Sequence, residues 1–281
     1  DQLMPEINDR FVAADGSFYP ATGERRGRVA LFVGCVMGTS YAHVHEATIR
    51  VLTRNGFDVA LIAGQGCCGA LHVHGGDPEG GRRLARRNID ALDSPYVDAI
   101  IVNAAGCGAA LKEYPHLLRD DHDYAERARA FSAKVRDAIE FLAERGLSAQ
   151  PGPLPVTVTY QEPCHLAHAQ RITRQPRVLL EAIPELRLIE MPESALCCGS
   201  AGIYNLLRPE MASALLERKL NNALSTGAEA IVSANPGCML QLQAGLRARG
   251  ERVPVLHLIE VLDRAYAAAP ASRPAEALAA G

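Results

Sequence analysis

Apolar residues along this chain fall into two kinds of run, and both kinds recur in each half of the sequence. Short runs rich in Val and Ile, without polar alternation, predict strands buried on both faces of a parallel sheet. Longer stretches with apolar residues three or four positions apart predict amphipathic helices between those strands. The predicted strands are residues 28–34, 57–63, 98–102, 156–160, 186–191 and 229–233. The predicted helices are residues 40–55, 79–92, 124–145, 175–183 and 209–224.

The order of these elements predicts an α/β fold. Strands and helices that alternate at these lengths form βαβ units with right-handed crossovers and parallel strands. The third strands of the two halves match, since residues 98–101 read DAII and residues 229–232 read EAIV. We therefore expect two homologous Rossmann-like βαβ domains with mostly parallel sheets, related by internal duplication.

Turn-forming residues indicate where the two domains are joined. Three prolines punctuate a Gly/Ser/Gln-containing stretch near the middle of the chain, as in a linker. We expect a first domain over residues 27–150 and a second over residues 151–268. Residues 1–26 have weak periodicity and are expected to form an N-terminal arm. The Ala/Pro-rich residues 269–281 are expected to form a flexible tail.

Composition narrows the class of protein. The chain has 281 residues, enough for two medium domains, and its net charge of −3 gives no sign of a nucleic-acid partner. It contains neither an apolar run of about 18 residues nor a signal-peptide pattern, so we expect a cytoplasmic protein without a membrane span. In that compartment clustered cysteines are metal ligands or catalysts more often than disulfides. The first residue is Asp1, not Met, and we expect a fragment of a longer protein.

All eight cysteines belong to two copies of one spacing. Each copy has a Cys-Cys-Gly triplet between one upstream and one downstream cysteine. The first set is Cys35, Cys67, Cys68 and Cys107, and the second set is Cys164, Cys197, Cys198 and Cys238. The offset between the copies is 129 residues at the first cysteine, 130 at the pair and 131 at the last. A repeat of this length favours two homologous domains over a solenoid.

Every cysteine of both sets follows a predicted strand. Open α/β sheets bind their ligands at the carboxyl ends of parallel strands, so three loops of each domain can bring four sulfur atoms together. Four thiolates suit a 4Fe–4S cluster, and we expect one or two such clusters, held by all eight cysteines. Neighbouring glycines would let backbone N–H groups surround the anionic cluster. Zinc also takes four thiolates, although its usual short C-x₂₋₄-C knuckles are absent, and isolated buried cysteines are often only small apolar residues.

The motifs around these cysteines resemble the cysteine-rich CCG domain family, found in one subunit of heterodisulfide reductase and in iron–sulfur subunits of several dehydrogenases. Residues 103–114 (NAAGCGAALKEY), 197–204 (CCGSAGIY) and 168–170 (HAQ) look like the iron–sulfur subunit of glycolate oxidase. The resemblance covers roughly residues 27–268 and rests on paired motifs, so it is specific at the family level.

The chain departs from the family pattern in two ways. The family motif ends in Cys-x-x-Cys, but Ala104 and Asn235 occupy the first position of that motif in the two repeats. Each set therefore offers four thiolates instead of five, which favours an ordinary four-cysteine cluster. The ferredoxin-like C-x₂-C-x₂-C-x₃-C segment of the glycolate oxidase subunit is also absent, and a ferredoxin-like segment or subunit is an expected partner.

The resemblance implies an electron-transfer subunit of a 2-hydroxy-acid (glycolate) dehydrogenase complex. Flavoprotein dehydrogenase subunits would supply electrons to this chain, and a quinone-type acceptor would receive them, with peripheral association at the inner face of the plasma membrane. One alternative is a catalytic subunit like that of heterodisulfide reductase, which performs thiol–disulfide chemistry at a cluster. The other is a zinc-binding or scaffold subunit. No catalytic residue is assigned, and the chain shows no flavin or nicotinamide site.

Histidines near the cysteines leave two interpretations open. They could tune a cluster or relay protons, or they could simply be solvated. The residues concerned are His43, His45, His72, His74, His165 and His168.

Overall fold

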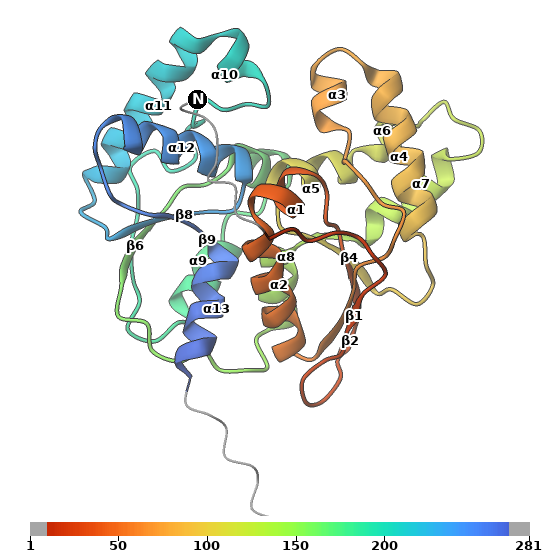
Figure 1. Cartoon of the computed structure of the whole chain (residues 1–281), viewed down its shortest axis with the longest axis horizontal. Coiled ribbons are helices and arrows are strands. Elements are labelled where there is room, and N and C mark those ends of the chain that lie inside the picture. The colour runs from red at the N-terminus through yellow and green to blue at the C-terminus, as the bar shows by residue number, and fades with distance from the viewer. Residues whose placement is uncertain (1–9, 270–281) are drawn as a thin grey trace, which may run out of the picture.

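A computed structural model describes residues 10–269 of the chain. Two sheets lie side by side with helices packed around them (Figure 1). The strand orders are β1-β3-β2-β4-β5 and β7-β6-β8-β9. Apart from β1, the two orders correspond strand for strand, as an internal duplication requires. The predicted α/β class with mostly parallel sheets is confirmed.

The first sheet is parallel except for one edge strand. Its strands are β1 (Phe18–Tyr19), β2 (Gly27–Leu31), β3 (Phe57–Ala60), β4 (Ala99–Val102) and β5 (Val135–Asp137). Strand β1 pairs antiparallel with β3, and all other pairs are parallel. All residues of β4 are buried, as the run of apolar residues predicts for a central strand.

The second sheet is parallel throughout. Its strands are β6 (Thr157–Tyr160), β7 (Arg187–Ile189), β8 (Ala230–Ser233) and β9 (Val255–His257). Its central strand β8 is buried at every position, like β4 in the first sheet. Strands at all six predicted places are present but shorter than predicted, and β1, β5 and β9 were not predicted.

Helices fill the connections in both repeats. Those of the first repeat are α1 (Val36–Ser40), α2 (Ala42–Arg54), α3 (Ala70–His74), α4 (Pro78–Leu92), α5 (Ala105–Lys112), α6 (Tyr114–Leu117), α7 (Ala125–Lys134) and α8 (Ala138–Arg145). Those of the second are the π-helical turn η1 (His165–Ala169), α9 (Gln175–Glu181), α10 (Tyr204–Leu207), α11 (Pro209–Leu224), α12 (Pro236–Ala248) and α13 (Leu258–Ala268).

The single long helix predicted over residues 124–145 is wrong, because β5 divides it into α7 and α8. Val135 is buried and pairs with the central strand β4, which satisfies its backbone in a sheet instead of a helix. Asp137 then starts α8 with a capping box: its side chain accepts a hydrogen bond from the Ile139 N–H at 2.9 Å, and the Glu140 carboxylate accepts one from the Asp137 N–H at 3.1 Å. Pairing with a distant strand therefore overrides the local helical pattern.

The same turn occurs at the corresponding place in the second repeat. His257 ends β9 and starts α13, and its Nδ1 accepts a hydrogen bond from the Ile259 N–H at 3.2 Å. The Glu260 carboxylate completes the capping box by accepting from the His257 N–H at 2.8 Å. The matched caps support the duplication independently of the cysteines.

One hydrophobic cluster spans both repeats. A single cluster of buried residues includes Val29 of β2 in the first repeat and Val232 of β8 in the second. Helices α2 and α13 lie against each other where the sheets meet (Figure 1). Arg50 on α2 and Asp263 on α13 form an ion pair at 2.8 Å across this contact. The cysteine-bearing edges of the two sheets are therefore held in a fixed relation.

The chain ends are only partly described. Of the expected N-terminal arm, residues 1–9 lie outside the described part, and the remainder includes β1, which pairs with the first sheet. The expected tail over residues 269–281 lies outside the described residues apart from Ala269. Within residues 10–269 no helix is both long and apolar enough to cross a membrane.

Candidate metal centre

The cysteines of the first set meet at the carboxyl edge of the first sheet. Cys35 follows β2, the Cys67–Cys68 pair follows β3, and Cys107 lies in the first turn of α5 after β4. From β2 the chain first adds β3 on one side, and it then returns to add β4 on the other side of β2. The order of strands therefore reverses between β2 and β4. Ligands of open α/β sheets bind at such a reversal, and Cys35 and Cys107 flank it.

Two sulfur atoms of this set lie in contact, and the others lie near them. The Sγ atoms of Cys35 and Cys67 lie 3.8 Å apart. Cys67 and Cys107 both act on the pKa of the Cys68 thiol, so these sulfurs lie near one another. The predicted convergence of the first set is thus present in the structure.

The second set repeats this arrangement. Cys164 follows β6, the vicinal pair follows β7, and Cys238 lies in the first turn of α12 after β8. Cys164 and Cys198 act on the pKa of the Cys197 thiol, and Cys238 acts on that of Cys198, so these sulfurs also lie near one another. None of the eight cysteines is in a disulfide.

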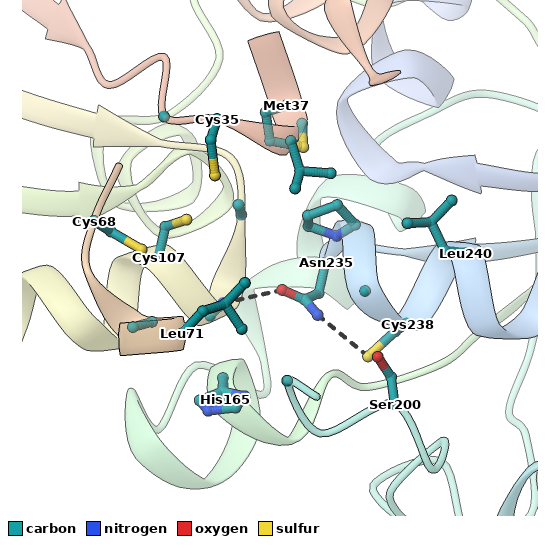
Figure 2. A pocket seen from close by; sticks show the side chains of 18 of the residues that line it. Cys35, Met37, Cys68, Leu71, Cys107, His165, Ser200, Asn235, Cys238 and Leu240 are labelled. Atoms are coloured by element: carbon teal, nitrogen blue, oxygen red, sulfur yellow. Dashed lines mark hydrogen bonds between the residues drawn. The ribbon is translucent and has the colours of Figure 1, made fainter. Parts of the chain in front are cut away.

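Both sets open into one cavity between the repeats. All eight cysteines line this cavity, whose volume is about 260 Å³. Figure 2 shows Cys35, Cys68 and Cys107 on one side of it and Cys238 on the other, with Asn235 between them. The sequence predicts two sites, but it does not predict that they face each other.

Hydrogen bonds lower the pKa of Cys67 in the first set and of Cys197 and Cys238 in the second. Hydrogen bonds from Cys35 and Cys68, and then one from the Gly69 N–H at 3.4 Å, lower the pKa of Cys67. The hydrogen bond that Cys35 donates to Cys67, together with partial desolvation of its sulfur, raises the pKa of Cys35. In the second set, the corresponding hydrogen bonds from Cys164, Cys198 and the Gly199 N–H lower the pKa of Cys197. Thiolates bind metals, so this pattern suits ligation.

The glycine of each Cys-Cys-Gly triplet is required by backbone geometry. Gly69 has φ +85° and Gly199 has φ +90°, a region that other residues rarely adopt. A Cβ at Gly199 would also run into the backbone carbonyl of Ala212 on α11. The turn directs the N–H of each glycine back to the sulfur of the first cysteine of the pair, at 3.4 Å in both repeats.

Asn235 occupies the place of the missing cysteine in the second repeat. Its Nδ2 donates a hydrogen bond to the Cys238 Sγ at 3.4 Å, and its Oδ1 accepts one from the Gly106 N–H at 3.0 Å (Figure 2). Ala104, its counterpart, is buried and has no side-chain donor. The sequence identified Asn235 only as an absent ligand, and its hydrogen bond to a cysteine was missed.

A buried lysine near the second set was also missed. Lys219 on α11 is 0% exposed, and its Nζ donates to the carbonyl oxygens of Glu193 and Ser194 at 2.7 and 2.9 Å. Its counterpart in the first repeat is Asn88 on α4. These two residues are 131 positions apart, like the last cysteines of the two sets. That offset is the sequence signal that could have drawn attention to this pair.

The histidines divide into two groups. His74 and His165 line the cavity, and their rings stack with centroids 6.1 Å apart. His45 is buried away from it, with Nε2 donating to the Val33 carbonyl at 2.9 Å. His43 lies 3.5 Å from the Glu260 carboxylate, and His72 and His168 are not among the residues that line the cavity.

The donor sets suit a group larger than one metal ion. Within residues 10–269 no three His, Cys, Asp or Glu side chains are arranged to hold a single ion. A zinc ion would need four ligands at about 2.3 Å from one point. Four soft sulfur donors around an open cavity, with glycine N–H groups directed at the sulfurs, fit an iron–sulfur cluster.

Fold and site together define a pair of cysteine-rich α/β domains that present thiolates to a shared cavity. The chain belongs to the CCG cysteine-rich domain family, whose model matches residues 29–112 and 158–243.

Sequence relatives agree with this assignment, and one solved structure shares the fold. A probable glycolate oxidase iron–sulfur subunit of Bacillus subtilis is 42% identical over 87% of this chain and 56% of the relative. The glycolate oxidase iron–sulfur subunit of Escherichia coli is 37% identical over 85% of this chain and 58% of the relative. The chain thus spans little more than half the length of these relatives. A hypothetical protein from Helicobacter pylori shares the fold, with a TM-score of 0.56 and 12% identity over 89% of this chain and 52% of that one.

Proposed function

We propose that each cysteine set holds one iron–sulfur cluster of the 4Fe–4S type, so that the chain carries two. The convergence of the four cysteines of each set on one cavity supports four-cysteine ligation. The ligands would be Cys35, Cys67, Cys68 and Cys107 for one cluster, and Cys164, Cys197, Cys198 and Cys238 for the other. When bound, such clusters accept and release single electrons.

The chain's own residues would hold and shield these groups. The N–H groups of Gly69 and Gly199 donate to cysteine sulfurs and so stabilise negative charge there. Asn235 fills the position of a fifth cysteine with an amide that is itself hydrogen-bonded. That arrangement argues against a five-cysteine site, and therefore against the disulfide-reducing alternative.

We further propose that the chain relays electrons within a complex that oxidises a 2-hydroxy acid such as glycolate. A flavoprotein subunit would supply the electrons and a quinone-type acceptor would receive them. The names of the Bacillus subtilis and Escherichia coli relatives support this assignment. The complex would be cytoplasmic and peripheral at the inner face of the plasma membrane.

The observation that carries the proposal is the convergence of two matched four-cysteine sets on one cavity. Anaerobically purified protein should contain about eight iron atoms and about eight acid-labile sulfides per chain, and an EPR signal should appear on reduction. Stoichiometric zinc without iron would contradict the cluster assignment.

Electron relay is tested separately with the complete subunit and a glycolate-oxidising flavoprotein. Addition of glycolate should bleach the cluster absorbance only when the flavoprotein is present. Intact clusters that glycolate and the flavoprotein leave unreduced, but that turn over disulfides with a reduced viologen dye, would favour the alternative function.

A further inference from the structure

The two cysteine sites are built on corresponding strands and helices, but different side chains surround them. Two of these differences occur at equivalent positions of the two repeats. Helices α4 and α11 both begin at a proline, Pro78 and Pro209, which are 131 residues apart. Each helix packs against the glycine of its Cys-Cys-Gly triplet: Gly69 lies close to α4, and Gly199 lies against α11. A residue on α4 and the residue 131 positions later on α11 are therefore placed in the same way relative to their cysteine sites.

In the first repeat, the side chain at this position is a neutral amide. Asn88 is buried, accepts a hydrogen bond from the Gly66 N–H at 2.8 Å and donates to the Cys67 carbonyl and the Tyr114 hydroxyl, both at 2.9 Å. The positive group beside the loop that leads to Cys67 is the exposed Arg87, whose Nε donates to the Gly64 carbonyl at 2.7 Å. The cation beside the first triplet is therefore exposed to solvent, where water and salt screen its charge.

In the second repeat, the corresponding side chain is a lysine. Lys219 is buried beside the loop that leads to the second Cys-Cys-Gly triplet, where its Nζ contacts two backbone carbonyls. Burial lowers its pKa, while the thiols of Cys198, Cys238 and Cys197 act in the opposite direction. An anionic cluster at those sulfurs favours the protonated ammonium further, because opposite charges attract strongly where water is excluded.

A second difference is independent of the first. Asn235 donates a hydrogen bond to the Cys238 sulfur at 3.4 Å, whereas Ala104 at the corresponding position cannot donate one. Hydrogen bonds to ligand sulfurs and nearby positive charge both stabilise the reduced cluster, which carries one more negative charge. Lys219 and Asn235 therefore act in the same direction on the second site.

We propose that the cluster held by Cys164, Cys197, Cys198 and Cys238 has a higher reduction potential than the cluster held by the first set. If both clusters are bound, an electron delivered to the first would pass to the second, which would oxidise the first and reduce the second. Lys219 and Asn235 are the residues that set this order. The inference rests on the proposed function, because it requires that both sets hold clusters.

The test is a redox titration of the anaerobic protein followed by EPR. Signals are assigned to the two sites with the single variants Cys67→Ala and Cys197→Ala. In the wild type the signal of the second site should appear first on reduction. Lys219→Gln keeps a donor for the carbonyls but removes the charge, and Asn235→Ala gives the second repeat the residue of the first.

Each of these two variants should shift the reduction equilibrium of the second cluster about tenfold toward oxidation, or about 59 mV for a one-electron couple. The double variant should bring the two potentials closer together. Lys134→Gln is the matched control, because the Lys134 Nζ also donates to a backbone carbonyl, that of Ser94 at 2.8 Å, but lies outside both sites. It should leave both potentials unchanged.

Two results would overturn the inference while leaving the clusters in place. One is a first site that is reduced at an equal or higher potential than the second. The other is a second-site potential unchanged in Asn235→Ala and in Lys219→Gln. If Lys219→Gln fails to assemble its cluster, Asn235→Ala decides alone. Absence of iron from the wild type would instead contradict the proposed function.

Discussion

The side chain of Asn235 accepts a hydrogen bond from the backbone N–H of Gly106 at 3.0 Å, which joins the second repeat to the helix that carries Cys107. Its amide nitrogen donates to Cys238 in the same arrangement. A backbone hydrogen bond from the Ala105 N–H to the Ala234 carbonyl, at 3.1 Å, lies beside it. The junction of the repeats is therefore built directly from the loops that carry the cysteines, and each site depends on the placement of the other repeat.

We expect removal of one ligand in either set to abolish only the cluster of that set. Cys67→Ala and Cys197→Ala should each lower the iron content by about half, because a cluster with three thiolates is poorly held while the other set is intact. The double variant should contain no iron. If either single variant lost all its iron, the eight cysteines would hold one shared group instead of two.

Substitution of Gly199, the glycine of the second triplet, should destabilise the protein by two effects. One is its positive φ, and the other is a steric clash with α11. Gly199→Ala forces alanine to φ +90° and places its Cβ against the Ala212 carbonyl. Gly227 has φ +64°, and a Cβ added there would have nothing within 4 Å, so Gly227→Ala is the matched control. We expect about 1 kcal/mol lost for Gly227→Ala and about 2 to 4 kcal/mol for Gly199→Ala.

Urea unfolding of the two glycine variants measures this difference, and iron content provides a second readout. Gly199→Ala should also bind less iron, since its N–H no longer points at Cys197. Equal free energies of unfolding for the two variants would show that the close approach to α11 costs nothing.

Acid should destabilise the protein through buried histidines. Burial lowers the pKa of His257 to about 3 and that of His45 to about 4, whereas both should titrate near about 6.5 in the unfolded chain. Between these values the unfolded state binds more protons, so the free energy of unfolding falls as pH falls from about 6.5 toward 3. Asp137 opposes this trend, because burial raises its pKa to about 7 and its contribution to stability grows as pH falls.

The histidine contribution can be isolated with His257→Gln. This variant cannot titrate, so the slope of unfolding free energy against pH between about 4 and 6 should decrease by up to about 1.4 kcal/mol per pH unit. The His257 Nε2 lies 2.9 Å from the Asn103 carbonyl, and glutamine can still donate there. An unchanged slope in chemical unfolding across this pH range would show that His257 does not titrate in this way.

Strand positions could be predicted where the sequence contains a continuous apolar run. Residues 99–102 and 230–233 are such runs, and both form central strands. The short strands β5 and β9 could not be predicted, because each has three residues and leads directly into a capped helix. Their existence depends on pairing with a strand that lies far away in the sequence.

The candidate site was predictable in its ligands but not in its assembly. The repeated spacing identifies all eight cysteines, and parallel strands explain why each set converges. Nothing in the local pattern indicates that α2 packs against α13 or that Gly106 contacts Asn235, so the shared cavity could not be anticipated. Lys219 lies within a predicted amphipathic helix, and only its backbone partners in the folded protein place it beside the second set.

The most direct test of the account is the EPR spectrum of the fully reduced, iron-loaded protein. Because both sets line one cavity, two reduced clusters would lie close enough for their electron spins to interact. We expect the wild-type spectrum to be broadened or split by this interaction, and Cys67→Ala and Cys197→Ala each to show a single signal without it. A wild-type spectrum equal to the simple sum of the two single-variant spectra would contradict the placement of two clusters at one shared cavity.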